Sequence, residues 1–254
     1  MSYSHAAPSS SLAGSPSDDV PEVLATGNSG ISTLFVSMSQ RHPHGHDSEY
    51  LRWHTLDHRP EQYRLASIKA SLRLISTPAC RAVRAVSSPR FDATDHIMTY
   101  FFTNIAGLEE FKDLAEALRN AGRLPYLLPS VQHGVFSVED KLAAKRVKVG
   151  ADVLPWWPAK GVYILIEEDG AMPNNLIDTP GIAGLWYAKL TPNPLSNAEG
   201  EQQITYLFLD SDPVKIGEQL RPLLKQRWEN TGTKPLFAAP FFTLVPHEWD
   251  RYLP

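Results

Sequence analysis

Histidine is concentrated in one short stretch of the chain. Five of the nine histidines fall between His42 and His58. His54 and His58 are four residues apart, which places both imidazoles on one face of a helix, one turn apart. Such a pair can share a metal ion, or one imidazole can act as an acid or base while the other tunes its pKa. The stretch is therefore the first candidate for chemistry.

Three interpretations of these histidines stay open. A metal site needs a third ligand, which His42, His44 or His46 could supply if the loop folded back. The run His42–His46 is equally typical of a solvated loop. The two helix histidines could instead be structural, satisfied by backbone groups at the break that Pro60 causes. In the third interpretation one of them faces a small-molecule pocket. We expect no bound metal.

Other side chains are weaker candidates. Tyr63 and Arg64 follow the helix break and His133 opens a strand, so all three could reach a pocket mouth, although a surface position suits His133 equally. Cys80, the only cysteine, lies in a turn context and is more simply a passive thiol. The chain has no Gly-x-Ser-x-Gly elbow, phosphate-binding loop or dinucleotide fingerprint.

Composition excludes several classes of protein. The net charge of −4 and the absence of a run of five basic residues argue against a nucleic-acid or anionic-membrane partner. The longest apolar runs are too short to span a bilayer, and no basic, apolar leader opens the chain. A single cysteine fits a reducing compartment. We expect a cytoplasmic protein with no membrane or nucleic-acid partner.

Hydrophobic patterning indicates one βαββαβ unit, a ferredoxin-like repeat. Residues 1–30, rich in Ser, Pro, Ala and Gly, are expected to be disordered. The first repeat with its connection then occupies 31–158. Its elements are a strand at Thr33–Gln40, a helix that Pro60 ends or follows with a new turn, and a strand or broken hairpin formed by Leu72–Ile75 and Ala82–Ser87. A strand at His96–Thr103, a helix at Gly107–Gly122 and a strand at His133–Val138 complete the repeat.

A second, degenerate repeat occupies 159–254. Strands are expected at Gly161–Glu167, Ile182–Leu190, Gln203–Asp210 and Phe237–Val245, with a helix that Asp212 caps. The segment Glu168–Gly181 looks like a loop where the first repeat has a helix, and Pro222 should interrupt the last helix.

The predicted fold class is α+β, with the two repeats packed sheet to sheet into one α+β barrel. The barrel would form within one chain, and a higher oligomer stays open. The enclosed faces should carry the mixed aromatic and polar sets Phe35, Ser37, Tyr100 and Phe102, and Tyr163, Tyr206 and Phe208. Such a lining suits a small-molecule pocket. A packed core without a pocket is the alternative.

The predicted first helix, which contains His54 and His58, also resembles a motif of a known family. Trp53-His54-Thr55-Leu56-Asp57-His58-Arg59-Pro60-Glu61 resembles the Trp-Tyr-Asp-x-x-His-x-Pro signature of dimeric α+β barrel proteins, in particular the EthD-like proteins. Trp53, His58 and Pro60 match in type and spacing. His54 and Thr55 depart from the residues that the family often has there. The resemblance implies a cavity into which His58 points.

Relatives in this superfamily include cofactor-free oxygenases, cyclases, lactone isomerases and haem enzymes, so function is argued by analogy. The resemblance suggests a small-molecule enzyme without an organic cofactor that transfers protons on an aromatic, phenolic or enolisable ligand. The expected catalytic residues are His58, His54 and Tyr100. The expected substrate-binding residues are Trp53, Tyr63, Arg64, Phe35, Phe102 and His133. The alternative is a non-catalytic ligand-binding or stress-response protein.

Overall fold

The computed structural model describes residues 12–24 and 27–253, and two βαββαβ units account for most of them. The first unit consists of β1 (Thr33–Ser39), α2 (Asp47–Trp53), a π-helical turn (His54–His58), α3 (Arg59–Gln62), β2 (Ile68–Ile75), β4 (His96–Phe102), α5 (Gly107–Asn120) and β5 (Ser130–Ala143). The second consists of β6 (Gly161–Glu168), β7 (Ile182–Leu190), β8 (Gln202–Leu209), α6 (Pro213–Thr231) and β9 (Lys234–Thr243). The additions are α1 (Pro21–Leu24), α4 (Pro78–Ala82) and β3 (Val86–Ser87).

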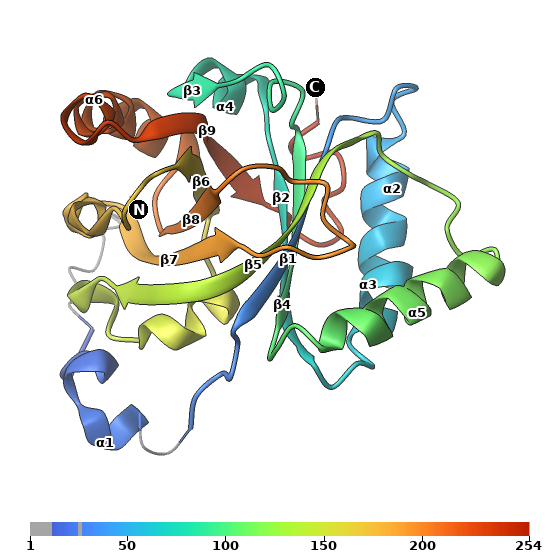
Figure 1. The fold of residues 1–254 in the computed structure, drawn as a ribbon, viewed down its shortest axis with the longest axis horizontal. Coiled ribbons are helices and arrows are strands. Elements are labelled where there is room, and N and C mark those ends of the chain that lie inside the picture. The colour runs from blue at the N-terminus through green and yellow to red at the C-terminus, as the bar shows by residue number, and fades with distance from the viewer. Residues whose placement is uncertain (1–11, 25–26, 254) are drawn as a thin grey trace, which may run out of the picture.

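The strands form one antiparallel sheet in the order β2-β4-β1-β5-β7-β8-β6-β9-β3. Within each unit the strands lie in the order second, third, first, fourth, which is the ferredoxin-like arrangement. The units join where β5 pairs with β7, and the ring closes where Leu74 and Ile75 of β2 pair with Thr243 and Phe242 of β9. The predicted tandem of ferredoxin-like repeats in a single-chain barrel is confirmed (Figure 1).

The barrel interior is apolar and fully packed. Alternate residues of every strand point into it, among them Leu34, Val36, Phe101, Trp186 and Phe208. Its polar contacts include a 2.6 Å hydrogen bond between the hydroxyls of Thr99 and Tyr206, and a 2.9 Å hydrogen bond that the side-chain amide of Gln132 donates to that of Gln202. A sheet face that is sealed by a second sheet has no access to water, so it takes the more uniformly apolar of the two strand faces.

The predicted lining of the barrel is therefore wrong for the first unit. Phe35, Tyr100 and Phe102 point outward, into a cluster beneath α5. Ser37 alternates with Val36 and so shares that outer face. In the second unit Tyr206 and Phe208 do point inward, but Tyr163 packs outward beneath α6. A strand shows its two faces to two different layers, and both faces of these strands are buried, so alternation alone does not say which one the barrel encloses.

Helices cover the outer faces of the ring (Figure 1). The segment α2–α3 and α5 cover the first unit, and α6 covers the second. Asp212 accepts hydrogen bonds from the amides of Val214 and Lys215 and so caps α6 as expected. The helix continues through Pro222 rather than being interrupted, because Ile216, Leu220 and Leu224 remain buried against the sheet and offset the one lost backbone hydrogen bond.

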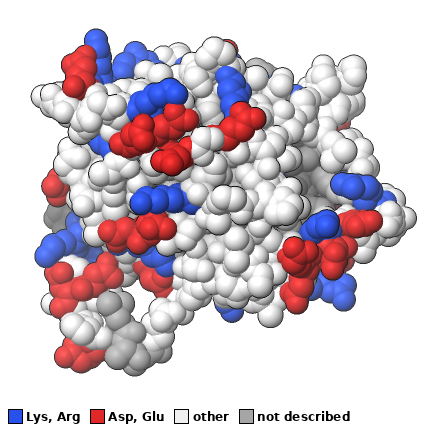
Figure 2. Space-filling view, viewed as in Figure 1, with Lys and Arg blue, Asp and Glu red and all other residues white. Residues whose placement is uncertain are grey.

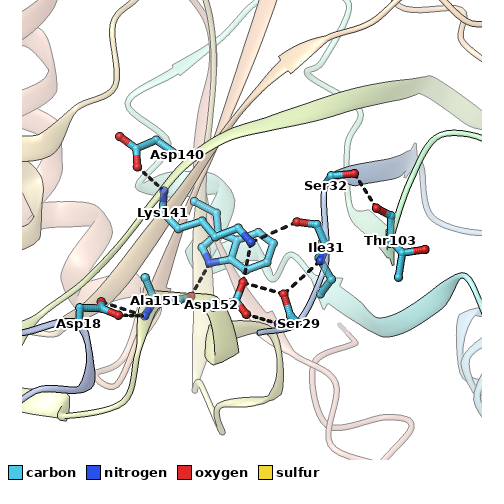
Figure 3. A network of polar contacts seen from close by, with 10 residues as sticks. Asp18, Ser29, Ile31, Ser32, Thr103, Asp140, Lys141, Ala151 and Asp152 are labelled. Carbon is cyan, nitrogen blue, oxygen red and sulfur yellow. Dashed lines mark hydrogen bonds and ion pairs between the residues drawn. The ribbon is translucent and has the colours of Figure 1, made fainter. Parts of the chain in front are cut away.

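The described part of the N-terminal segment is attached to the barrel end (Figure 3). The carboxylate of Asp18 accepts a hydrogen bond from the amide of Ala151 at 3.0 Å, and Ser29 Oγ donates to Asp152 at 2.6 Å. Lys141 Nζ donates to the same aspartate at 2.7 Å. These contacts differ from the disorder expected of residues 1–30. Residues 1–11, 25 and 26 lie outside the described part of the chain.

The molecular surface mixes charges of both signs. Figure 2 shows acidic and basic side chains next to one another on the face in view, with broad areas that carry neither. Within residues 12–24 and 27–253, no helix combines the length and the apolar character that a membrane crossing requires.

Candidate functional site

A pocket of about 350 Å³ lies between the helical segment α2–α3 and the outer face of the first unit's strands, β2, β4, β1 and β5. Its roof is the row of Tyr50, Trp53, His54 and His58 on that segment. Phe111 of α5 closes one side. The loop that follows α5 forms the mouth, where Leu127 is 68% exposed. The volume falls in the range of small-molecule sites.

The pocket floor is a row of side chains that runs straight across four strands. Arg73 on β2 pairs with Met98 on β4, which pairs with Ser37 on β1, which pairs with His133 on β5. All four line the pocket, and Tyr100 lies on the neighbouring row. Because adjacent strands lie about 4.8 Å apart, the row spans roughly 14 Å from Arg73 to His133. The floor therefore has Arg73 and His133 at its ends, with Met98 and the small side chain of Ser37 between them.

A π-helical turn over His54–His58 shapes the roof. The amide of Arg59 donates to the carbonyl of His54, five residues earlier, so the helix is one residue wider here than an α-helix. Pro60 then lies at the start of α3, where its missing amide proton costs little. The ring of His58 lies 5.1 Å from that of Trp53 and 5.4 Å from that of His54, so the three side chains turn toward the pocket together.

Both roof imidazoles are neutral at physiological pH. Burial, followed by the positive charge of Arg73, holds the pKa of His54 well below its usual range. The same two causes lower the pKa of His58 to about 4. Nε2 of His54 lies 3.4 Å from the hydroxyl of Tyr100, and Nε2 of His58 lies 3.3 Å from Nε2 of Gln62. The Nδ1 atoms of both imidazoles are buried without a hydrogen-bond partner.

Two further polar groups complete the set. Burial raises the pKa of Tyr100, so its hydroxyl stays protonated and can donate a hydrogen bond. His133 stacks on Phe35 with ring centroids 6.0 Å apart, and burial lowers its pKa. The pocket thus offers neutral imidazoles and a phenol against aromatic walls.

Arg73 supplies the positive charge of the pocket. Its side chain is 3% exposed. Nη2 donates to the Tyr50 hydroxyl at 2.9 Å, and the guanidinium lies 5.2 Å from the centroid of that ring. Nε is buried without a partner. No acidic residue lines the pocket among those the structure describes, and the buried carboxylate of Asp47 pairs instead with His96 at 2.7 Å.

Comparison with known proteins defines the fold. No family model matches the chain, and no curated protein matches it in sequence. Solved structures do match over nearly the whole length. A dye-decolorizing peroxidase from Bacteroides thetaiotaomicron is 8% identical, with a TM-score of 0.51 over 87% of this chain and 94% of the other. A protein provisionally assigned as a chlorite dismutase is 10% identical, with a TM-score of 0.50 over 88% and 100%. The chain has the dimeric α+β barrel fold.

A third match, an anthrone oxidase-like protein, is 12% identical with a TM-score of 0.49 over 86% of this chain and 94% of the other. At such identities a dimeric α+β barrel match defines the fold and not the chemistry, because the fold hosts many reactions. The chemistry of this barrel has to be argued from its own pocket.

The pocket unites six of the nine candidate residues from the sequence: His54, His58, Tyr100, Trp53, Phe35 and His133. The other three lie elsewhere. Tyr63 is 45% exposed and hydrogen-bonds Ser71 at 2.6 Å, and Arg64 pairs with Glu61 on the surface. Phe102 packs beneath α5 against Phe111. These side chains follow the helix or alternate on the strand as expected, but they lie beyond the pocket walls.

Arg73, Tyr50, Met98 and the mouth loop were missed from the sequence. One signal was present for Arg73, since it interrupts the apolar run Leu72–Ile75. A charged residue on a strand that is buried on both faces calls for a specific reason. Nothing in the sequence shows that the row opposite this residue holds Met98, Ser37 and His133, because that register is a long-range property of the sheet.

The loop histidines lie apart from the roof histidines. His42 and His46 contact each other, with ring centroids 5.0 Å apart. Within residues 12–24 and 27–253, no group of three His, Cys, Asp or Glu side chains has an arrangement that could hold a metal ion. The described geometry therefore does not provide a metal site in which a loop histidine folds back to join His54 and His58.

Haem enzymes are among the relatives that the resemblance implies, so the pocket was tested for an axial ligand. Iron coordination needs an imidazole nitrogen whose lone pair faces open space. In His54 and His58 the Nδ1 atoms are buried, and the Nε2 atoms already contact Tyr100 and Gln62. A pocket of about 350 Å³ also lies at the lower end of the range for small-molecule sites. Neither His54 nor His58 is therefore placed as a haem ligand.

The outer face of the second sheet is filled. Ile216, Leu220 and Leu224 of α6 pack directly on Tyr163 and Leu207. Three further pockets lie around this unit among the described residues, and no histidine lines any of them. The two repeats thus share topology but not the site, which belongs to the unit that keeps its first helix.

Proposed function

We propose that the protein is an enzyme that transfers protons on a small aromatic, phenolic or enolisable substrate in the first-unit pocket, without a tightly bound organic cofactor. The observation that supports this most is the meeting of two neutral imidazoles, one buried and one partly buried, with a protonated phenol in one pocket of small-molecule size. Isomerisation, cyclisation or oxygenation would all begin with such a proton transfer.

His58 takes the role of proton acceptor in this proposal. A substrate hydroxyl or acidic C–H replaces the long contact between His58 and Gln62, and its proton passes to the imidazole Nε2. The electron pair left behind forms a phenolate or enolate. In an isomerisation the same proton returns to a different atom of the substrate, so the imidazole ends the cycle neutral. Tyr100 donates a hydrogen bond to His54 or to the substrate oxygen.

The test is turnover by a pocket variant and by a matched surface variant. A panel of phenols and cyclic β-dicarbonyls is screened first for conversion by the wild-type protein. We expect His58→Ala to lower the rate by about 10²–10⁴-fold, the usual contribution of a positioned acid or base. His46→Ala, on the exposed loop, should leave the rate unchanged. Full activity of His58→Ala with unchanged melting temperature would remove His58 from the mechanism.

One observation favours a ligand-binding protein as the second candidate. An imidazole with a pKa of about 4 is a weak base in the free protein, which suits a hydrogen-bonding role in a binding site. The two candidates separate in a single sample. A binding protein would be stabilised against heat by its ligand and would return that ligand unchanged, whereas an enzyme would return a product that mass spectrometry detects.

A further inference from the structure

The charge of Arg73 has no acidic partner among the residues that the structure describes. The largely buried side chain of Arg227 shows how such a charge is usually neutralised, since it pairs with the carboxylate of Glu167 at 2.5 Å. Arg73 instead contacts the neutral hydroxyl and ring of Tyr50. A buried guanidinium without an anionic partner is costly, and proteins seldom retain one without a reason.

The surroundings of Arg73 add no compensation. The titratable groups that line the pocket with it are three histidines and three tyrosines, none of which can supply a carboxylate: His54, His58, His133, Tyr50, Tyr100 and Tyr126. Burial lowers the pKa of each of the three histidines, so their imidazoles are neutral at physiological pH. Asp47 lies at the start of α2 but is held by His96 and by the amide of His42. The pocket therefore carries the positive charge of Arg73, whose side chain is buried where water screens it weakly.

The position of Arg73 decides which part of a ligand would meet the charge. It lies at one end of the floor row, and the middle of the row is Met98 and Ser37. Phe35, Trp53 and Phe111 line the walls above that middle section. A flat aromatic body fits the middle, with a charged group at the Arg73 end and a hydrogen-bonding group near His133.

From this geometry we infer that the ligand of the pocket is an aromatic molecule that bears an anionic oxygen, a carboxylate or an ionised phenol, and that this oxygen pairs with Arg73. The inference rests on the proposed function in that the pocket is a small-molecule site, but it does not require catalysis. Arginine suits this role because its planar fork of donors matches a carboxylate and binds a phenolate oxygen through charge-assisted hydrogen bonds.

The test compares isosteric probe pairs by calorimetry on the full chain. The carboxylate arm uses 2-naphthoate against 2-naphthamide. The phenolate arm uses 4-nitrophenolate against 4-nitroanisole at about pH 8, where the imidazoles are neutral. We expect the anion of at least one pair to bind roughly 10- to 100-fold tighter than its neutral partner, the range for a charge-assisted hydrogen bond. The arm that shows the preference identifies the source of the anionic oxygen.

Variants assign that preference to Arg73. Arg73→Met should abolish it, while Arg52→Met, which removes the same charge from the exposed side of α2, should keep it. Equal affinity within both pairs for the wild-type protein, including no binding of either member at about 1 mM, would overturn the inference. That comparison needs no variant, so it stands even if Arg73→Met does not fold. If the protein shows no preference for either anion but turns over a neutral substrate, and if that turnover requires His58, the proposed function holds and the inference about Arg73 is wrong.

Discussion

Arg73 lies over the ring of Tyr50 at 5.2 Å and donates to its hydroxyl at 2.9 Å, and this neutral partner takes the place of a carboxylate. Strand β2 thus places a charge, and α2 a phenol, on opposite walls of one pocket. The same α2 segment provides His54 and His58, and their low pKa values depend in part on that charge. The charge, the imidazoles and the pocket form one unit.

The two buried arginines should respond oppositely to loss of charge. Arg227→Met leaves the carboxylate of Glu167 buried without its ion-pair partner, which should lower the free energy of unfolding by about 3–5 kcal/mol. Arg73→Met removes an uncompensated buried charge and should leave the free energy of unfolding unchanged or raise it. Urea unfolding of both variants measures this. A larger loss from Arg73→Met than from Arg227→Met would show that Arg73 has a structural counter-charge.

Stability should fall as the medium becomes mildly acidic. In the unfolded chain His58 has a pKa near 6.5, and in the folded protein partial burial, then Arg73, lower that pKa to about 4. Between these values the unfolded state binds the proton and the folded state does not, so the free energy of unfolding falls as pH drops from about 6.5 to about 4. Above that window His58 contributes no pH dependence. His54, lowered by burial, acts in the same direction.

A glutamine at position 58 isolates this contribution. His58→Gln cannot take up a proton, so the drop in unfolding free energy between pH 7 and pH 5 should shrink by about 1 kcal/mol, which is roughly half of the unscreened value because the group is only partly buried. Urea unfolding at the two pH values provides the measurement. An unchanged drop would mean that the folded protein protonates His58 as readily as the unfolded chain does.

A larger side chain on the pocket floor should weaken ligand binding without lowering the stability of the fold. Ser37 lies at the centre of the floor, so Ser37→Leu places an apolar side chain in the space of the ligand. We expect binding of the preferred probe to weaken at least tenfold with little change in melting temperature. Ser137→Leu, on the same sheet face of β5 but outside the pocket, is the matched control. Equal binding by both variants would place the ligand somewhere else.

Separating the units should expose the barrel core. A fragment that ends at Pro158 lacks β7 and β9, so β5 and β2 lose their partners and the face that holds Leu34, Val36 and Phe101 meets water. The fragment should aggregate or form an obligate dimer. Size-exclusion chromatography with light scattering gives its mass. A stable, fully folded monomer would mean that the units are independent and that the closed ring is not required.

The positions of many strands and helices could be predicted from the sequence, because each depends mainly on the pattern of neighbouring residues. Alternation located β1, β4, β7 and β8 to within a residue or two, and Asp212 with Pro213 marked the start of α6. The tandem order followed from counting elements. The pair His54 and His58, which lies in the π-helical turn after α2, was also a local signal, because residues four apart in a helix lie on nearly the same face.

The errors concern long-range properties. The barrel encloses Leu34 and Val36 rather than Phe35 and Ser37, and this choice depends on which face the second sheet covers. The place of Arg73 in the pocket floor depends on the pairing of β2 with β4, and the residues that surround it there are remote in sequence. Pro222 is tolerated because packing of α6 outweighs one hydrogen bond. In each case tertiary packing overrode a local preference.

The most direct test of the central claim is a crystal structure of the protein with 2-naphthoate or 4-nitrophenolate, whichever binds more tightly. The account predicts ligand density between the α2–α3 segment and the first sheet. The anionic oxygen should lie within hydrogen-bonding distance of Arg73, with the ring over Met98 and the His58 imidazole at its edge. Density confined to another site, such as the groove beside residues 189–203, with the Arg73 pocket unchanged, would contradict it.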